Sequence, residues 1–400
     1  MTAPVIDLGS PTLFRDAGHR DVFRRLRADS PIYLQSRHPL YGDFWNVTRH
    51  EDILALDLDS ELLSAEDTFL LEQAHPEYHL PMFLAMDPPR HDLFRDAIKP
   101  FFTGAGLKAI ESSIRDRASA IVRRLPVATT FDWVQEVSCE LTSQVLALMF
   151  DYPQARRGEL VRWSDLATGV AAEPGAPAPD WAARREGMMA CLAAFNALRA
   201  ERAGTPDRGD LLSLLVHDRG TGRLRPSEFL GAILMLVVAG NDTTRNSVTG
   251  AALAFHHHPG EWERLRATPG LMATATAEVF RWQTPVAYIR RVARIDFERH
   301  GRRILAGDKV VLWYASGNQD ETVFPDPERF DVGRDNLRRS LAFGFGIHRC
   351  IGMRLADLQL RILWEEVMLR FSRVEVVGDA VPVASNFIRG YASLPVRLHR

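Results

Sequence analysis

Hydrophobic and polar residues follow a helical pattern over most of the chain. In six segments, apolar residues recur three and four positions apart, which is typical of amphipathic helices with one buried face. These segments are residues 51–57, 90–102, 107–124, 134–150, 181–202 and 261–282. The pattern therefore predicts a mainly helical protein.

A seventh helix is predicted to be much longer than the others. It begins at Ser227 as N-cap and ends at the His-Pro-Gly stretch of residues 258–260, so that it spans about 30 residues and about 45 Å. Its first part, residues 229–239, is apolar on every face. This run is shorter than the roughly 18 residues of a membrane span, so we expect a core helix that crosses the molecule.

Strand patterns are few and short, and they predict a minor β part made of small sheets or hairpins. They cover residues 44–48, 302–314 with a turn at Gly307-Asp308, 373–378 and 394–398. The Pro-, Gly- and Ala-rich stretch 172–180 lies between two helical patterns and predicts a mobile surface loop. Since no linker divides the chain, we expect residues 1–400 to form a single domain.

Composition and charge narrow the functional classes. The 49 Lys and Arg residues nearly balance the 51 Asp and Glu residues, for a net charge of −2, which argues against a nucleic-acid partner. The three cysteines, Cys139, Cys191 and Cys350, form no C-x-x-C pair, which argues against a disulfide framework or a cysteine-rich zinc site. The first thirty residues lack a signal-peptide pattern, so we expect a soluble, cytoplasmic protein.

One of these cysteines lies in an unusual stretch, FGFGIHRCIG at residues 343–352. Gly344, Gly346 and Gly352 remove side chains where a bulky planar group would approach, and they permit backbone angles that other residues avoid. A helical pattern follows Cys350 directly. Unpaired N–H groups and the helix dipole are therefore predicted to lower the pKa of Cys350 and hold it as a metal-binding thiolate.

The spacing F-x-x-G-x-x-x-C-x-G, formed by Phe343, Gly346, Cys350 and Gly352, resembles the haem-binding loop of the cytochrome P-450 superfamily. The resemblance implies that fold, with haem b between the long central helix and the cysteine loop and its helix. It also implies that Cys350 is the thiolate ligand of the haem iron and that Phe343, Gly344 and Gly352 lie against the cofactor. Without the resemblance, Cys350 would be a buried structural cysteine.

A second motif, AGNDTT at residues 239–244, resembles the oxygen-binding stretch of the family's central helix. It implies that Ala239 and Gly240 border the cofactor and that Asp242 and Thr243 deliver protons during oxygen reduction. A threonine hydroxyl inside a helix can bond the carbonyl four residues back and open the helix locally, which would make room for O2 and water. The alternative is a polar helix end followed by a new N-cap.

Four cationic or imidazole side chains are implied to hold the haem propionates. His91 and Arg95 are one helical turn apart in DPPRHDLFR, residues 87–95, and the family places Arg291 and His348 nearby. Cations suit two carboxylates held in an apolar crevice. A solvated helix face is the alternative for His91 and Arg95.

A Glu-x-x-Arg pair at Glu278 and Arg281 matches a further family motif. The same spacing occurs at residues 261–264 and 263–266, where it is typical of surface ion pairs. The position of Glu278 ahead of Thr284-Pro285 selects the match. The resemblance implies a buried pair, joined by Arg329, that supports the haem face structurally and takes no part in catalysis.

The function implied is a monooxygenase that inserts one atom of O2 into a substrate C–H bond and releases the other as water. No flavin or nicotinamide fingerprint is visible, so a ferredoxin-type donor is expected, paired with its own reductase. Opposite charge would steer it toward exposed arginines near the cysteine, and we expect a monomer. These arginines are Arg338, Arg339, Arg349 and Arg354.

The substrate pocket implied by the resemblance is apolar, which predicts an apolar substrate. It comprises Met235, Val238, Ala239, Val286, Ala287, Tyr288, Ile289, Phe387 and Ile388. Residues 171–180 would form its lid. The stretches 239–247, 307–321 and 346–366 look most similar to the bacterial branch that hydroxylates terminal carbons of alkanes, fatty acids and linear terpenes.

Several alternatives remain open at this point. A cyclic terpenoid, a steroid or an alkylaromatic is the rival substrate. A haem-thiolate sensor without turnover and a peroxide-driven hydroxylase are rival functions. Asp242 and Thr243 count against the sensor, because it needs no proton relay, and Thr243 counts against the peroxide-driven hydroxylase, which could dispense with the alcohol.

Overall fold

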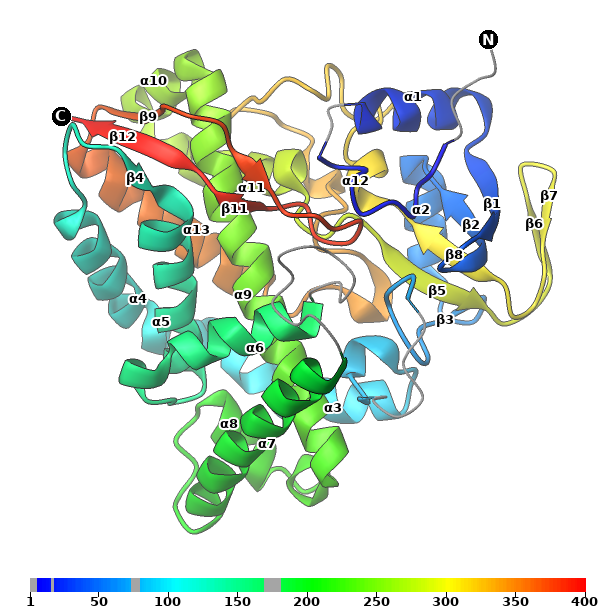
Figure 1. Cartoon of the computed structure of the whole chain (residues 1–400), viewed down its shortest axis with the longest axis horizontal. Coiled ribbons are helices and arrows are strands. Elements are labelled where there is room, and N and C mark those ends of the chain that lie inside the picture. The colour runs from blue at the N-terminus through cyan, green and yellow to red at the C-terminus, as the bar shows by residue number, and fades with distance from the viewer. Residues whose placement is uncertain (1–5, 16–17, 73–79, 169–180) are drawn as a thin grey trace.

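The computed structural model describes residues 6–15, 18–72, 80–168 and 181–400. Most of the helices occupy one side of the molecule together with the sheet near the C-terminus, whereas the largest sheet and the N-terminal helix occupy the other (Figure 1). The predicted loop and lid at 171–180 lie outside the described residues. The helices are α1 (His19–Asp29), α2 (His50–Leu58), α3 (Arg90–Ile98), α4 (Gly104–Arg124), α5 (Glu140–Met149), α6 (Gly158–Thr168), α7 (Trp181–Ala203), α8 (Leu211–His217), α9 (Pro226–His257), α10 (Pro259–Ala267), α11 (Met272–Gln283), α12 (Tyr314–Gly317) and α13 (Met353–Arg370).

The long helix α9 passes through the middle of the molecule (Figure 1) and contains 32 residues. It is buried from Phe229 to Val238 and packs against α5, α6, α11 and α13, so the prediction of a core helix is confirmed. Its start was placed two residues too late, with Ser227 as N-cap in place of Arg225. The helix begins at Pro226, and the Glu228 carboxylate accepts the Arg225 backbone N–H at 3.1 Å. Proline is favoured at this first position because its missing N–H has no helical partner there.

Three predicted helices are interrupted where the local backbone changes. The segment 261–282 is two helices, α10 and α11, separated by a 3-10 turn at Pro269–Leu271, because proline cannot continue the ladder of an α-helix. Pro100 likewise marks the 3-10 turn Lys99–Phe102 after α3. The segment 134–150 opens with a π-helical turn, Val134–Cys139, before α5.

The strands form small sheets with long-range pairing. They are β1 (Ile32–His38), β2 (Gly42–Val47), β3 (Leu63–Ser64), β4 (Phe131–Asp132), β5 (Ile289–Ala293), β6 (Phe297–Arg299), β7 (Arg302–Ile304), β8 (Lys309–Leu312), β9 (Arg373–Val376), β10 (Val381–Pro382), β11 (Tyr391–Ser393) and β12 (Pro395–His399). The largest sheet has the order β1-β2-β8-β5-β3, with β2 and β8 parallel. The predicted strands at 44–48, 373–378 and 394–398 are confirmed as β2, β9 and β12.

The segment 302–314 does not fold back on itself as one hairpin. Its first half, β7, pairs with β6, whereas its second half, β8, pairs with β5 and β2. Gly307 still makes the turn between them, with φ +90°, a left-handed value that glycine adopts without strain. The predicted turn is correct, and the pairing partners come from elsewhere in the chain.

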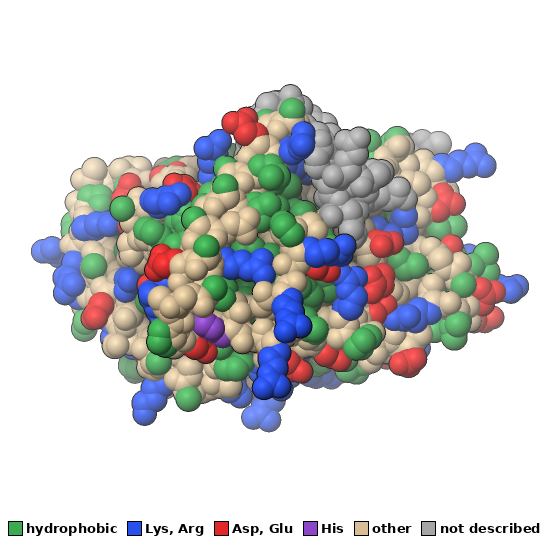
Figure 2. Space-filling view, turned by 90° about the horizontal axis from the view of Figure 1, so that it is seen from below, with side chains coloured by type: hydrophobic (Ala, Val, Ile, Leu, Met, Phe, Trp, Pro, Cys, Tyr) green, Lys and Arg blue, Asp and Glu red, His purple; other side chains and the backbone are tan. Residues whose placement is uncertain are grey.

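Buried hydrophobic side chains join the helical side and the sheet side into one connected core. Trp133 and Trp364 stack at 5.6 Å between ring centroids near the centre of the helical side. Within the described ranges, no helix is long and apolar enough to cross a membrane. On the face in Figure 2, basic and acidic side chains are interspersed around a central gathering of apolar ones.

Candidate active site

A cavity lies between α9 and the loop that precedes α13. It holds about 1420 Å³ of space between protein atoms, including open solvent at its mouth. Ala239, Gly240 and Thr243 of α9 form one part of its wall, and Phe343 and Cys350 form another. The two motifs, roughly a hundred residues apart in sequence, therefore face one space.

The cysteine loop depends on two left-handed glycines. Gly344 and Gly346 have φ values of +61° and +65°. A Cβ at Gly346 would also lie 2.5 Å from the Asp57 carbonyl oxygen, so no larger residue fits. The Cys350 N–H closes the loop by donating to the Phe343 carbonyl at 2.8 Å.

Gly352 differs from the other two glycines. It is the N-cap of α13 with φ −83°, and a Cβ there would meet only ordinary contacts at 3.8 and 3.9 Å. The prediction that Gly352 supplies an unusual backbone angle is therefore wrong. It lines the cavity beside the cysteine sulfur, so its small size keeps that part of the wall open.

The prediction that the pKa of Cys350 is lowered is wrong. Cys350 has accessible surface toward the cavity, but protein surrounds it, and this burial raises the pKa of the thiol. The backbone N–H groups of Gly352 and Met353, together with Arg95, offset only part of this increase. Because α13 begins three residues beyond Cys350, its dipole stabilises the thiolate less than it would stabilise a cysteine at the first residue of the helix.

A polar corner of the cavity contains the predicted propionate contacts. Arg95, Arg291 and His348 line the cavity, whereas His91 lies behind His348 with ring centroids 4.5 Å apart. Burial and the nearby Arg291 lower the pKa of His348 to about 2, so its ring is neutral. His91 Nε2 and both His348 ring nitrogens are buried without hydrogen-bond partners among the described residues. Such a corner suits carboxylates that accept hydrogen bonds.

Asp57, at the end of α2, is a polar residue of this corner that the sequence did not reveal. Its side chain is 1% exposed and lies 3.7 Å from Arg291. It accepts hydrogen bonds from the Tyr314 hydroxyl and the Phe345 N–H, both at 2.8 Å. Burial raises the pKa of Asp57, which Arg291 partly opposes. Asp57 thus fixes the cysteine loop and orients Arg291 from a distant part of the chain.

The polar stretch of α9 divides between two sides of the helix. The Thr243 hydroxyl donates to the Ala239 carbonyl at 2.6 Å, which leaves its oxygen as an acceptor at the cavity wall. Asp242 points away from the cavity and forms an ion pair with Arg245 at 2.8 Å. Arg245 also contacts Asp165 at 3.2 Å, whose side chain is 33% exposed. A chain of charged groups therefore leads from behind Thr243 toward solvent.

The Glu278–Arg281 pair is buried, but its third member was assigned wrongly. Both side chains are 0% exposed, and two hydrogen bonds of 2.7 Å join them. The Arg334 side chain completes the network at 3.2 Å from Glu278. Arg329 contributes only its backbone carbonyl, and its side chain is 59% exposed. The spacing along the meander misled the match by five positions.

Most of the predicted substrate pocket lines the cavity, with two exceptions. Ala287 and Tyr288 are buried outside it. The Ala287 N–H donates to the Phe387 carbonyl at 2.8 Å, and the Tyr288 hydroxyl accepts the Leu71 N–H at 3.1 Å. Val286 and Ile289 both reach the cavity. Strict alternation would place them on opposite faces, but regular strand begins only at Ile289. The residues confirmed in the lining are Met235, Val238, Ala239, Val286, Ile289, Phe387 and Ile388.

Further lining residues were not predicted; Thr244 and Phe280 lie inside two of the motifs, and the others lie outside them. They include Phe69, Phe83, Leu84, Phe102, Met149, Leu236, Thr244, Ser247, Phe280 and Gln359. Most of them are apolar core-type residues, so their hydrophobicity predicts burial but does not tell a cavity wall from a packed interior.

The cavity as a whole fits haem. Its walls are largely apolar, a cysteine sulfur is accessible from it, and Arg95, Arg291 and His348 gather where two propionates would require donors. The buried histidine nitrogens without partners support this assignment, because such groups are costly unless a ligand satisfies them.

Comparison with known proteins agrees with the geometry. The cytochrome P450 family model matches residues 270–388. A linalool 8-monooxygenase from Pseudomonas putida is 35% identical over 98% of each chain, and a methyl-branched lipid omega-hydroxylase from Mycobacterium tuberculosis (strain ATCC 25618 / H37Rv) is 32% identical over 98% of this chain and 94% of its own. The structure of CYP153D17 from Sphingomonas sp. PAMC 26605 matches with a TM-score of 0.92 and 38% identity, covering 98% and 99% of the two chains.

The chain therefore belongs to the cytochrome P450 family, whose members bind haem and use O2. It is an oxidoreductase of the monooxygenase class, as its named relatives are. The sensor without turnover is thereby set aside.

Proposed function

We propose that this enzyme hydroxylates a terminal or methyl carbon of an open-chain apolar substrate: an alkane, a fatty acid or a terpene. The observation that carries this proposal is that Cys350 and Thr243 face one cavity whose remaining wall is mainly apolar. One relative is named for linalool, an open-chain terpene alcohol, and another for the omega position of a methyl-branched lipid. Both names favour attack near the end of a flexible chain.

Side chains of this protein would hold the haem at its iron and at its propionates. Haem b bound with Cys350 as thiolate ligand would supply the activation of O2. Arg95, Arg291 and His348 would bind its propionates directly, and His91 would support His348 from behind. Asp57 would keep Arg291 in place.

Thr243 and Asp242 would manage protons from the α9 side. Thr243 presents a hydroxyl oxygen to the cavity, and its own hydrogen is bonded to Ala239. Asp242 connects through Arg245 to Asp165 near the surface. Although burial alone would lower the pKa of Arg245, Asp242 and Asp165 raise it, so Arg245 stays charged and keeps both carboxylates together. A proton could be passed to Thr243 only after this pair opens.

Thr243→Ala should separate oxygen consumption from product formation. Substrate binding should stay within about twofold of wild type, since a methyl group keeps the apolar wall, whereas most electrons should appear as hydrogen peroxide because the positioned hydroxyl is gone. Parallel measurement of donor oxidation, peroxide and hydroxylated product tests this.

Thr243→Ser is the matched control, because it retains the hydroxyl and should recover much of the coupling. Undiminished coupled product formation by Thr243→Ala would count against the proton role and would favour the peroxide-driven alternative.

The substrate class is tested by titrating the enzyme with a panel of alkanes, fatty acids, terpenes, steroids and alkylaromatics. We expect open-chain members to give the tightest spin-state shift and products oxidised at a terminal carbon. Tighter binding of a steroid, cyclic terpenoid or alkylaromatic, with oxidation on its ring, would overturn the assignment in favour of that rival.

We propose that a ferredoxin delivers the electrons to the cysteine side of the molecule. Arg338, Arg339, Arg349 and Arg354 are all exposed there. The Arg349 carbonyl accepts a hydrogen bond of 2.6 Å from Arg95, so the arginine side chain is the part left for a partner. We further propose that the enzyme is a single-domain monomer that acts in the cytoplasm; its one continuous core supports the single domain.

Reversing charge at Arg339 and Arg349 together, both to Glu, should slow reduction by a ferredoxin about tenfold at low salt, and less at high salt, because opposite charges steer docking. Stopped-flow reduction across a salt series measures this.

The control variant reverses the charges of Arg302 and Arg303 in β7, which lies in a hairpin at the far edge of the sheet side (Figure 1). It should leave the rate unchanged. Equal rates for wild type and the Arg339/Arg349 variant would remove this docking face.

A further inference from the structure

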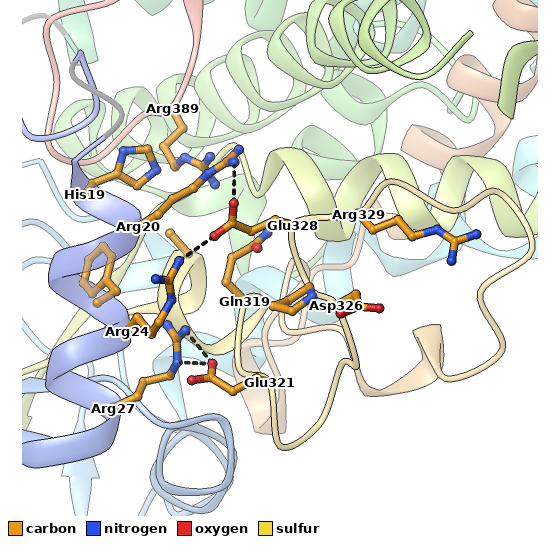
Figure 3. Close-up of a pocket in the computed structure, with 13 residues that line it drawn as sticks. His19, Arg20, Arg24, Arg27, Gln319, Glu321, Asp326, Glu328, Arg329 and Arg389 are labelled. Atoms are coloured by element: carbon orange, nitrogen blue, oxygen red, sulfur yellow. Dashed lines mark hydrogen bonds and ion pairs between the residues drawn. The ribbon is translucent and has the colours of Figure 1, made fainter. Parts of the chain in front are cut away.

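A second pocket lies on the other side of the core, between α1, α12 and the chain near residues 326–329 (Figure 3). It holds about 920 Å³ of space between atoms, including open solvent. None of its described lining residues also lines the Cys350 cavity. The monooxygenase reaction gives this pocket no task.

Most of the charged groups in this pocket are paired. Glu328 accepts hydrogen bonds from Arg20 at 3.3 Å and from Arg24 at 2.9 Å. Arg27 pairs with Glu321 at 2.7 Å. Arg329 extends away from the other side chains (Figure 3). The charged side chains in the lower part of the pocket in Figure 3 therefore compensate one another.

Arg389 is the exception. Among the described residues, no carboxylate pairs with its side chain and no acceptor is hydrogen-bonded to it. Its guanidinium lies 5.4 Å from the Phe14 ring centroid, a contact worth about 0.5–1 kcal/mol when exposed. The Arg389 side chain is half-buried, and a partly desolvated cation without a counter-charge is costly.

A second cation stands beside Arg389. The side chains of Arg20 and Arg389 lie next to each other at the top of the pocket (Figure 3). Burial, and to a lesser extent repulsion by Arg20, lower the pKa of Arg389 to about 10, so it is still charged at neutral pH. Arg20 shares the Glu328 carboxylate with Arg24. The two neighbouring guanidinium groups of Arg20 and Arg389 therefore have too little negative charge beside them, and an added anion would stabilise them.

The backbone holds Arg389 in a fixed position. Its N–H donates to the Pro285 carbonyl at 2.8 Å, and its carbonyl accepts from the Gln283 side chain at 2.9 Å. The preceding residue, Ile388, forms a β-bridge with Val286. The backbone of Arg389 is therefore fixed, and its guanidinium rests against the Phe14 ring, so a ligand has less of this side chain to order on binding.

We infer that the pocket between Arg20 and Arg389 binds the carboxylate of a small organic acid. A carboxylate matches the planar fork of a guanidinium and would bridge the two arginines. The pocket offers one unpaired cation, which favours a single negative charge. Phe23 and Ala315 also line the pocket and would contact a small apolar part of the acid.

The inference is tested on the holoenzyme by calorimetry with acetate, with acetamide as the neutral analogue of equal shape, at constant ionic strength. Acetate should bind to the wild type and acetamide should not. Arg389→Gln should weaken acetate binding at least tenfold. Arg329→Gln, which removes a neighbouring charge that points away from the pocket, should change it less than twofold.

Thermal unfolding distinguishes a binding role from a structural one. Without acetate, Arg389→Gln should melt at the wild-type temperature or above it, because the substitution removes a half-buried cation that has no counter-charge. Acetate should raise the melting temperature of the wild type and of Arg329→Gln, but not that of Arg389→Gln. Acetate binding by Arg389→Gln with wild-type affinity, equal binding of acetamide and acetate, or a lower melting temperature of this variant without acetate would overturn the inference.

Discussion

Cys350→Ser should abolish hydroxylation completely. The serine oxygen is a harder and weaker electron donor than a thiolate, and a thiolate opposite the oxygen site is what favours cleavage of the O–O bond. The reduced, carbon monoxide-treated wild type should show the red-shifted Soret band of thiolate ligation, and the variant should lack it. Absorption spectra and product analysis on the same samples measure both effects.

Cys191→Ala provides the matched control. Cys191 is fully buried and is absent from the cavity wall, so this variant should keep the spectrum and the activity even if it loses some stability. A red-shifted band in Cys350→Ser, or its absence from the wild type, would refute the assignment of the ligand.

Glu278→Gln should destabilise the protein by about 3–5 kcal/mol, which is typical when one partner of a buried ion pair is removed. Glu278 faces both Arg281 and Arg334 inside the core and also accepts the Asp331 N–H at 3.1 Å. The neutral amide has nearly the same shape but leaves two buried guanidinium groups without a counter-charge. Urea titration gives the change in free energy of unfolding.

Glu263→Gln is the matched control, because Glu263 and Arg266 have the same Glu-x-x-Arg spacing in an exposed setting. Glu263 is 67% exposed and lies 3.8 Å from Arg266, so its loss should cost less than about 1 kcal/mol. A similar cost for both variants would mean that burial of the Glu278 network contributes nothing to stability.

Helical periodicity was sufficient to predict most of the helical framework, because one buried face leaves the same spacing in any amphipathic helix. It was not sufficient at Pro269, where apolar spacing continues across a break in the backbone. The pairing of β8 with β2 could not be predicted either, because the two strands lie far apart in the sequence and no local pattern links them.

The candidate site likewise contains some residues that the sequence could identify and others that it could not. The cysteine loop is a contiguous motif with fixed spacing, and two of its glycines, Gly344 and Gly346, meet a backbone requirement, so Phe343, Gly346 and Cys350 could be identified directly. Asp57 and Arg334 act through contacts with distant segments, and neither belongs to a motif. Tyr288 was assigned to the pocket with its neighbours because a sequence range does not show which way alternate side chains point.

The largest sheet draws its strands from both halves of the chain, and this has a consequence for biosynthesis. β1 and β2 emerge from the ribosome long before β8, their central partner. Until β8 arrives, one edge of β2 lacks its neighbour, and exposed edges invite pairing with other chains. Nascent chains stalled before Lys309 should therefore depend on chaperones far more than chains stalled after Trp313.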